Sequence, residues 1–222
     1  MEKFKNKLIL KILEKFQAIA ALESLAALAD WDLNTYMPVK AAEDRGFILG
    51  KVNILMKNLI LDKDFKNLIE KCQLEDLNEY EKAVVRILTR EINIIEKLPD
   101  DFIENWNKTT NQAQVVWREA KKNNDFKKFQ PYLQKIIDLV KKKSELLSYQ
   151  DHPYDALVDL FEEGWTTADF NVFFNLIKEP LRNLLAKIQS APNYQGKHPL
   201  EDEIYDKEKM KELNFYVLSL LK

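Results

Sequence analysis

Apolar residues recur every three or four positions along most of this chain, which is the spacing of one face of an α-helix. The first such stripe runs from about residue 3 to residue 34 and predicts a helix roughly 48 Å long at 1.5 Å per residue. Pro38 ends that helix, because the residue before a proline is disfavoured in the helical conformation. The apolar positions of this first stripe are Phe4, Leu8, Ile12, Phe16, Ile19, Leu22, Leu25 and Leu28.

The same periodicity continues to the end of the sequence and predicts an all-α protein. Pro131 is expected at the first position of its helix, where the missing N–H is no loss. Pro180 is expected to kink or split its helix, and residues 191–205 are expected to form a loop. We therefore expect a single helical domain over residues 1–222, built as an array of long helices. The further helices are predicted over about residues 41–61, 63–71, 78–97, 100–123, 131–147, 154–161, 167–188 and 206–222.

Composition places this helical chain among soluble globular proteins, with 46% hydrophobic and 32% charged residues. A net charge of −2 shows none of the excess of basic residues that is typical of nucleic-acid-binding proteins. No stretch of consecutive apolar residues approaches the ~18 that a membrane-spanning helix needs. Lys11, Lys15 and Glu23 interrupt the N-terminal apolar stretch at helical spacing, which favours an amphipathic helix over a signal peptide. Cys72 is the one cysteine, and we expect it to be a small, half-buried residue. We expect a cytoplasmic protein that binds neither nucleic acid nor membrane.

Residues typical of catalytic sites are scarce in this sequence. Its two histidines, His152 and His198, each precede a proline, and no His-Glu-x-x-His zinc motif is present. We expect His152 to cap or pack at a helix junction and His198 to be exposed to solvent. The sequence therefore predicts no catalytic residue, no metal ligand and no cofactor-binding residue in this chain.

The end of the first predicted helix is the most distinctive stretch of the sequence. Asp30 and Asp32 flank Trp31, Tyr36 follows shortly before Pro38, and Arg45 lies beyond the turn. One interpretation is a pair of carboxylates lining a cleft. The other is a structural corner in which the acids bond to Arg45 across the turn. We favour the structural corner, because the chain offers these acids no partner histidine and no metal motif.

Three segments of the chain resemble conserved stretches of the M32 metallocarboxypeptidases, the carboxypeptidase Taq type. Residues 28–45 are similar to that family's WDxxTYMPxxAAExR stretch, with Arg45 as its last residue. Residues 117–133 resemble WxEAKxxNDFxxFxPxL, and residues 154–166 resemble YDALLDxYEPGxT, with Glu162-Glu163 in place of Glu-Pro. The resemblance extends from about residue 8 to residue 222 and covers less than half of the family's usual sequence.

The resemblance implies the N-terminal wall or lid of a grooved, zincin-type helical peptidase that releases single residues from peptide C-termini. In that family the zinc ligands and the catalytic glutamate lie in a C-terminal half that is absent from these 222 residues. The resemblance therefore implies zinc and peptide substrate only for the complete enzyme, and no activity for this chain alone. Residues Asp30, Trp31, Asp32, Tyr36 and Arg45 would belong to the groove wall or its structural corner.

Two alternatives to a peptidase fragment remain open. The chain could be a stand-alone helical module for binding, regulation or oligomerisation, or an enzyme with a site built from acids such as Asp30, Asp32 and Glu119. Helices that lack their packing partners would leave apolar area exposed, which predicts self-association. The expected partners are therefore a second copy in a homodimer or a separate C-terminal catalytic half.

Overall fold

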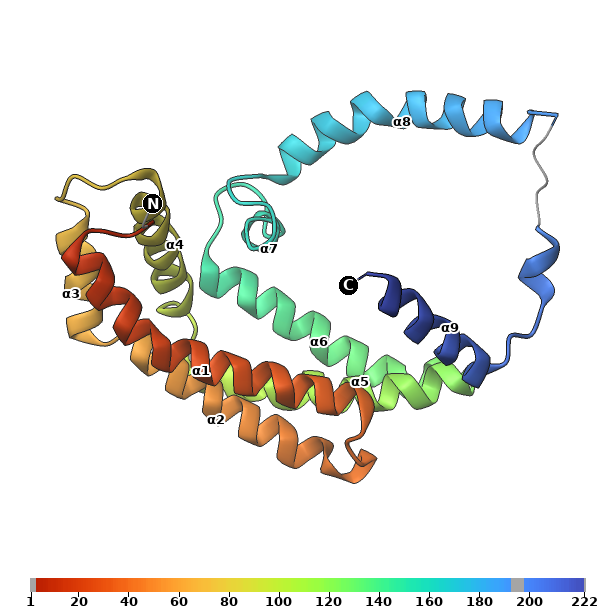
Figure 1. Ribbon diagram of the computed structural model, residues 1–222, viewed down its shortest axis with the longest axis horizontal. Helices are drawn as coiled ribbons and strands as arrows, with labels where there is room; N and C mark the ends of the chain where they lie inside the picture. The colour runs from red at the N-terminus through yellow and green to blue at the C-terminus, as the bar shows by residue number, and fades with distance from the viewer. Residues whose placement is uncertain (1–2, 193–197, 222) are drawn as a thin grey trace. The chain divides into compact units, whose positions relative to one another are not determined.

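The computed structural model describes residues 3–192 and 198–221, and every regular element in those ranges is helical (Figure 1). The all-α prediction is confirmed. The chain divides into two units, Met1–Thr166 and Thr167–Lys222, so the expected single domain stays a prediction. The first unit contains α1 Lys7–Thr35, the 3-10 turn η1 Val39–Ala41, α2 Ala42–Ile60, α3 Lys63–Cys72, α4 Glu79–Ile95, α5 Asp100–Lys122, α6 Phe126–Leu147 and α7 Asp155–Val158; the second contains α8 Thr167–Gln189, η2 Pro199–Asp202 and α9 Lys207–Leu220.

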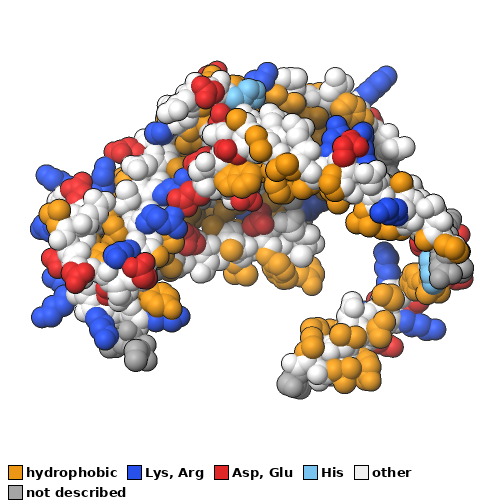
Figure 2. All heavy atoms as spheres, turned by 90° about the horizontal axis from the view of Figure 1, so that it is seen from above, with side chains coloured by type: hydrophobic (Ala, Val, Ile, Leu, Met, Phe, Trp, Pro, Cys, Tyr) orange, Lys and Arg blue, Asp and Glu red, His pale blue; other side chains and the backbone are white. Residues whose placement is uncertain are grey.

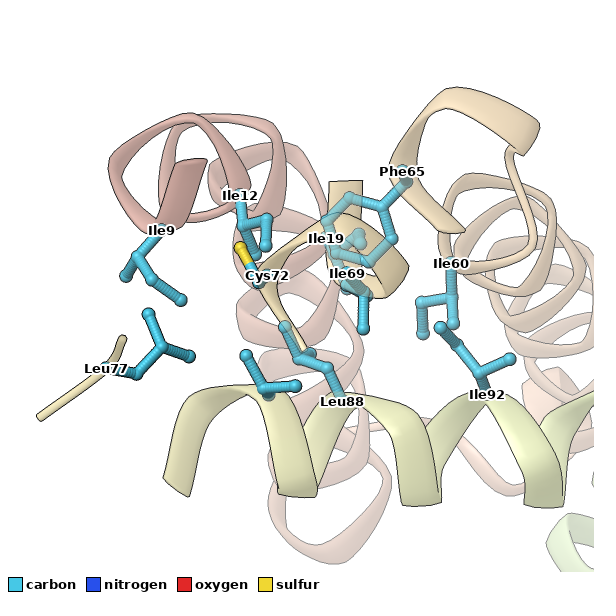
Figure 3. Close-up of a cluster of buried hydrophobic side chains, with 11 residues drawn as sticks. Ile9, Ile12, Ile19, Ile60, Phe65, Ile69, Cys72, Leu77, Leu88 and Ile92 are labelled. Carbon is cyan, nitrogen blue, oxygen red and sulfur yellow. The ribbon is translucent and has the colours of Figure 1, made fainter. Parts of the chain in front are cut away.

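Helices α1, α3 and α4 pack around a common hydrophobic core, which is joined by the last residue of α2 (Figure 3). Phe65 is its largest member and is 1% exposed. Cys72 also lies in this core, where burial raises the pKa of its thiol. The thiol is thus more deeply buried than the sequence suggested. The core consists of Ile9, Ile12, Ile19, Ile60, Phe65, Ile69, Cys72, Leu77, Val85, Leu88 and Ile92.

Helices α2 and α5 approach each other closely along a face of small residues on α2. Ala42, Gly46 and Gly50 are spaced four apart and are buried, so they lie one above another on one face of the helix. A Cβ atom built on Gly46 would lie 2.9 Å from the Cα of Lys108, and one on Gly50 would lie 3.3 Å from the Cα of Glu104. Glycine is needed at Gly46, because a backbone atom cannot move aside as a flexible side chain can.

Prolines account for two differences between the expected and the observed helices. Helix α6 begins at Phe126 instead of Pro131, because the Asp125 carboxylate accepts a hydrogen bond of 3.1 Å from the backbone N–H of Lys128 and caps the earlier turn. Pro131 therefore lies inside the helix, at the cost of one backbone hydrogen bond. Pro180 lies inside α8 without splitting it.

Several predicted apolar stripes are exposed in the structure. Leu25 and Leu28 of α1 are 60% and 62% exposed, although Ile9, Ile12 and Ile19 on the N-terminal half of the same helix are buried in the core. No described residue of α8 or α9 is buried. Hydrophobic side chains accordingly reach the molecular surface in the view of Figure 2. Apart from the start of α6, the periodicity located the long helices, but it did not identify which of their faces are covered.

Glu81 joins the starts of two helices. Its carboxylate accepts hydrogen bonds from the backbone N–H groups of Lys5, Asn6 and Asn78 at 2.7, 2.8 and 3.0 Å. Asn6 is the N-cap of α1 and Asn78 that of α4, so one acid satisfies donors at both N-termini. The Glu81 side chain is 3% exposed, and these backbone hydrogen bonds lower the pKa of its carboxyl.

We expect Glu81 to make the stability of the fold depend on pH. The pKa of the Glu81 carboxyl is lower in the folded chain than in the unfolded chain, so the ionised carboxylate stabilises the fold. This stabilisation is complete at pH values above the ordinary carboxyl pKa. It is lost as the pH falls through the pKa of the folded state. A Glu81→Gln variant should unfold at lower temperature than the wild type at neutral pH, with the gap narrowing in acid. Thermal unfolding followed by circular dichroism at several pH values measures this. Glu79→Gln, which changes an exposed acid of the same turn, is the control, and an equal pH dependence in wild type and Glu81→Gln would contradict the prediction.

Candidate functional site

The corner between α1 and α2 is held by Arg45. Its guanidinium donates hydrogen bonds to the backbone carbonyl of Ala29 at 2.6 Å and to the carboxylate of Asp32 at 2.5 Å. The Arg45 and Asp32 side chains are 20% and 35% exposed, so the pair is partly withdrawn from solvent. A cation near the end of α1 also suits the negative end of the helix dipole. The contact between Asp32 and Arg45 that the sequence suggested is present.

The other predicted corner residues lie on the surface. Asp30 contacts Asn34 and not Arg45, through a hydrogen bond of 3.2 Å from the Asn34 amide. Trp31 and Tyr36 are 54% and 78% exposed, and their ring centroids are 5.5 Å apart. This aromatic pair therefore presents apolar surface to solvent in the described part of the chain. Such an exposed pair suits contact with a ligand or with another polypeptide segment.

A second arginine fixes the same helix end from α5. Arg118 donates to the backbone carbonyl of Leu33 at 2.7 Å and to the side-chain oxygen of Asn34 at 2.6 Å. Gln114 donates to that same Asn34 oxygen at 2.5 Å. The segment around Trp117 is thus joined directly to the segment around Trp31. Sequence reasoning missed Arg118, because nothing in its local pattern shows a partner 84 residues away.

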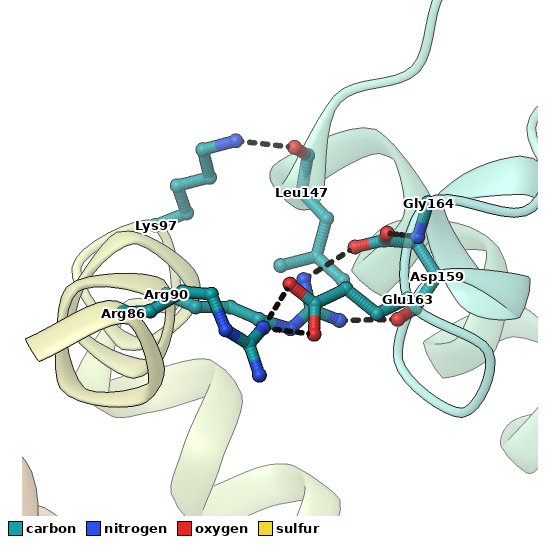
Figure 4. Close-up of polar contacts among 7 residues, drawn as sticks. All are labelled: Arg86, Arg90, Lys97, Leu147, Asp159, Glu163 and Gly164. Carbon is teal, nitrogen blue, oxygen red and sulfur yellow. Dashed lines mark hydrogen bonds and ion pairs between the residues drawn. The ribbon is translucent and has the colours of Figure 1, made fainter. Parts of the chain in front are cut away.

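The third segment is tied to α4 by two further arginines (Figure 4). Arg90 donates to the carboxylate of Asp159 at 2.8 Å and also to the Asp159 backbone carbonyl. Arg86 forms an ion pair with Glu163. The other carboxylate oxygen of Asp159 accepts from the N–H of Gly164 at 2.8 Å, and Gly164 has a φ of +80°, which glycine adopts readily. Burial acts to raise the pKa of the Asp159 carboxyl, but the hydrogen bonds from Gly164 and Arg90 together lower it. At Glu163 the hydrogen bond from Arg86 lowers the pKa of the carboxyl, and burial opposes that shift.

Each of the three segments is thus held by hydrogen bonds to a neighbouring helix. All three lie within one match between this chain and a family of known proteins. A family model described as carboxypeptidase Taq (M32) metallopeptidase matches residues 11–221. This chain belongs to the M32 metallopeptidase family.

Similar M32 proteins include two curated carboxypeptidases. Thermostable carboxypeptidase 1 of Pyrococcus furiosus is 41% identical over 218 residues, which are 98% of this chain and 44% of that protein. Carboxypeptidase 1 of Bacillus subtilis is 31% identical over 91% of this chain and 41% of its own length. The chain therefore spans less than half the length of the curated relatives it matches.

Solved structures of M32 proteins share the fold. The Pyrococcus furiosus carboxypeptidase superposes with a TM-score of 0.81 at 41% identity, over 98% of this chain and 44% of that one. Metallocarboxypeptidase 1 of Trypanosoma cruzi superposes with a TM-score of 0.73 at 28% identity, over 97% of this chain and 44% of that one. The match to the family is consistent with the N-terminal portion of an M32 carboxypeptidase.

The described residues do not fit the zinc that the M32 resemblance implies. Within residues 3–192 and 198–221, no group of three or more His, Cys, Asp or Glu side chains could hold a metal ion. His152 caps a turn by accepting a 3.1 Å hydrogen bond at Nδ1 from the N–H of Tyr154, as expected for a histidine at a helix junction. His198 is exposed and accepts at Nδ1 from the N–H of Leu200 at 3.2 Å. None of the helices in these ranges is long and apolar enough to cross a membrane.

We expect Arg45 to contribute measurably to the stability of the M32 corner. An Arg45→Met variant loses both hydrogen bonds and should lower the free energy of unfolding by about 1–2 kcal/mol, the range for bonds to a charged group discounted for partial exposure. Urea denaturation followed by circular dichroism measures the change. The control is Arg86→Met, which removes an ion pair between half-exposed side chains and should cost less than about 1 kcal/mol. Equal losses in the two variants would contradict the structural role of Arg45.

Proposed function

We propose that this chain forms the N-terminal helical part of an M32-type zinc metallocarboxypeptidase and supplies one wall of its substrate groove. The observation that carries this proposal is the family match over residues 11–221, against relatives more than twice as long. The exposed Trp31–Tyr36 pair would line the groove, while Asp32, Arg45 and Arg118 would hold the corner that carries it.

The reaction would be the release of single residues from the C-termini of peptides. A zinc hydrolase of this kind needs about three protein ligands and a general base. We propose that these groups come from sequence outside the 222 residues, whether in the same polypeptide or in a separate catalytic half. The 222 residues alone would then bind no catalytic zinc and release no amino acid, and the whole enzyme would act in the cytoplasm.

A chimeric enzyme tests this proposal. The corresponding N-terminal part of the Pyrococcus furiosus carboxypeptidase is replaced by these residues, and release of C-terminal amino acids is measured with zinc added. We expect an active chimera, and we expect the isolated 222-residue chain to be inactive. A folded but inactive chimera, or zinc-dependent activity of the isolated chain, would contradict the proposal.

A second candidate function is a stand-alone module for binding, regulation or oligomerisation. The observation that favours it is the exposure of the apolar residues of α8 and α9, including Phe174, Leu185 and Leu218. Exposed apolar area on this scale is typical of interaction surfaces. Light scattering tests it, because the module would form a concentration-dependent homodimer, whereas a strict monomer at high concentration would count against it.

A further inference from the structure

A cleft of about 250 Å³ lies within the first unit, and the proposed groove does not account for it. It is lined from five helices, by Glu23 of α1, Ile60 of α2, Glu91 of α4, Phe102 and Trp106 of α5, and Lys143 of α6. At roughly 30 Å³ for each liquid water, the volume corresponds to about eight water molecules, which is the size of a small organic ligand.

Two carboxylates line the cleft, Glu23 and Glu91. Neither side chain makes a hydrogen bond or ion pair with any residue that the structure describes. Burial raises the pKa of Glu91, the negative charge of Glu23 raises it further, and Arg90 acts in the opposite direction. The two acids therefore repel each other and would both gain from a cation placed between them.

Two lysines also line the cleft. Lys57 is paired with the carboxylate of Asp100 at 2.6 Å, so the lysine available to a ligand is Lys143. Its Nζ lies 5.0 Å from the centroid of the Trp106 ring, and it has no carboxylate partner in the described part of the chain. Burial lowers the pKa of this ammonium, and no acid contributes to the shift. Glu91 and Lys143 thus carry opposite charges in one cleft without compensating each other.

Apolar and aromatic side chains also line the cleft, together with the amides of Asn53 and Asn107. Phe102 is 2% exposed, and its ring centroid lies 5.9 Å from that of Trp106. Ile60 is 3% exposed and lines the same cleft. The cleft therefore combines unpaired acids, an unpaired lysine and an aromatic wall, which are the three kinds of contact that a zwitterion with an apolar side chain requires.

We propose that this cleft binds a free α-amino acid with a large apolar side chain, with the ammonium at Glu23 and Glu91, the carboxylate at Lys143 and the side chain against Phe102 and Trp106. The proposal rests on the cleft alone and is independent of the peptidase assignment. An amine without a carboxylate would leave Lys143 unpaired, and an organic acid without an ammonium would leave both glutamates unpaired.

Titration with L-phenylalanine tests the proposal on the full 222-residue chain. Binding is followed through the indole N–H signal of Trp106, assigned by comparison with Trp106→Phe. We expect a saturable shift at about millimolar ligand or below, the range of weak small-molecule binding. Phenylalaninamide and N-acetylphenylalanine, which each lack one charge of the zwitterion, should bind at least about tenfold more weakly. No saturable shift with L-phenylalanine, or equal binding of either blocked compound, would overturn the proposal.

Matched variants locate the site. Lys143→Gln and Glu91→Gln should each weaken L-phenylalanine binding at least about tenfold, since each removes one charged contact. Lys141→Gln on the same helix and Glu70→Gln on α3 change exposed residues outside the cleft and should leave binding unchanged. Unchanged binding in both cleft variants would overturn the proposal. The blocked ligands keep the test decisive if a cleft variant fails to fold, because they leave the protein unaltered.

Discussion

Replacing Phe65 by alanine is expected to lower the free energy of unfolding by about 3–5 kcal/mol, the usual range for deleting a buried phenylalanine side chain. Phe65 is the largest side chain of the core between α1, α3 and α4, and it is 1% exposed (Figure 3). The loss combines the transfer of its ring to water with the cavity left behind. Urea denaturation of the variant and the wild type, followed by circular dichroism, measures the difference.

Leu74→Ala is the control for the Phe65 variant. Leu74 follows the same helix but is 90% exposed, so its truncation should change the free energy of unfolding by less than about 0.5 kcal/mol. A loss below about 1 kcal/mol for Phe65→Ala would show that the ring does not fill the core as described.

Replacing Gly46 by leucine should cost about 3 kcal/mol, at the upper end of the usual range for overpacking. The Cβ atom of the new side chain would already lie 2.9 Å from the Cα of Lys108. Because that Cα is a backbone atom of α5, the two helices α2 and α5 would have to move apart. Because Arg45 and Arg118 hold the same helix end from α2 and α5, we expect the corner at Asp32 to loosen as well. Urea denaturation gives the stability change, and amide exchange at residues 33–36 reports on the corner.

Gly50→Ala is the matched control on the same face of α2. Its added Cβ would lie 3.3 Å from the Cα of Glu104, a tight contact that asks for a shift of only a few tenths of an ångström. Alanine also favours the helix by about 1 kcal/mol over glycine, so the net change should lie within about 1 kcal/mol. If Gly46→Leu were as mild as Gly50→Ala, the close approach of the two helices would be wrong.

The helices could be predicted from the sequence because their signals are local. The apolar positions between Ile9 and Ile19 recur every three or four residues, and Pro38 disfavours the helical conformation of the residue directly before it. The exposure of Leu25 and Leu28 could not be predicted, since it depends on which elements cover that half of α1. The start of α6 was wrongly predicted at Pro131. The Asp125 cap outweighs the preference of proline for the first helical turn, so the helix begins at Phe126.

The candidate site was predictable to the same limited extent. Asp32 and Arg45 are 13 residues apart across one turn, and that contact followed from the sequence. The contact from Arg118 to Leu33 spans 85 residues and depends on the packing of α5 against the rest of the unit. The cleft between Glu91 and Lys143 draws on five helices, so no single stretch of sequence could indicate it.

The carboxylate of Glu81 has a further consequence for how the fold assembles and opens. Its hydrogen bond to Asn6 closes a loop of 75 residues, and ordering a loop of that length carries an entropic cost that local helix contacts do not. The N-terminal segment should therefore dock late in folding and detach early in partial unfolding. The backbone N–H groups of Lys5 and Asn6 both donate to the Glu81 carboxylate. Their amide protons would therefore exchange with solvent each time the N-terminal segment detaches, ahead of the amides in the middle of α1.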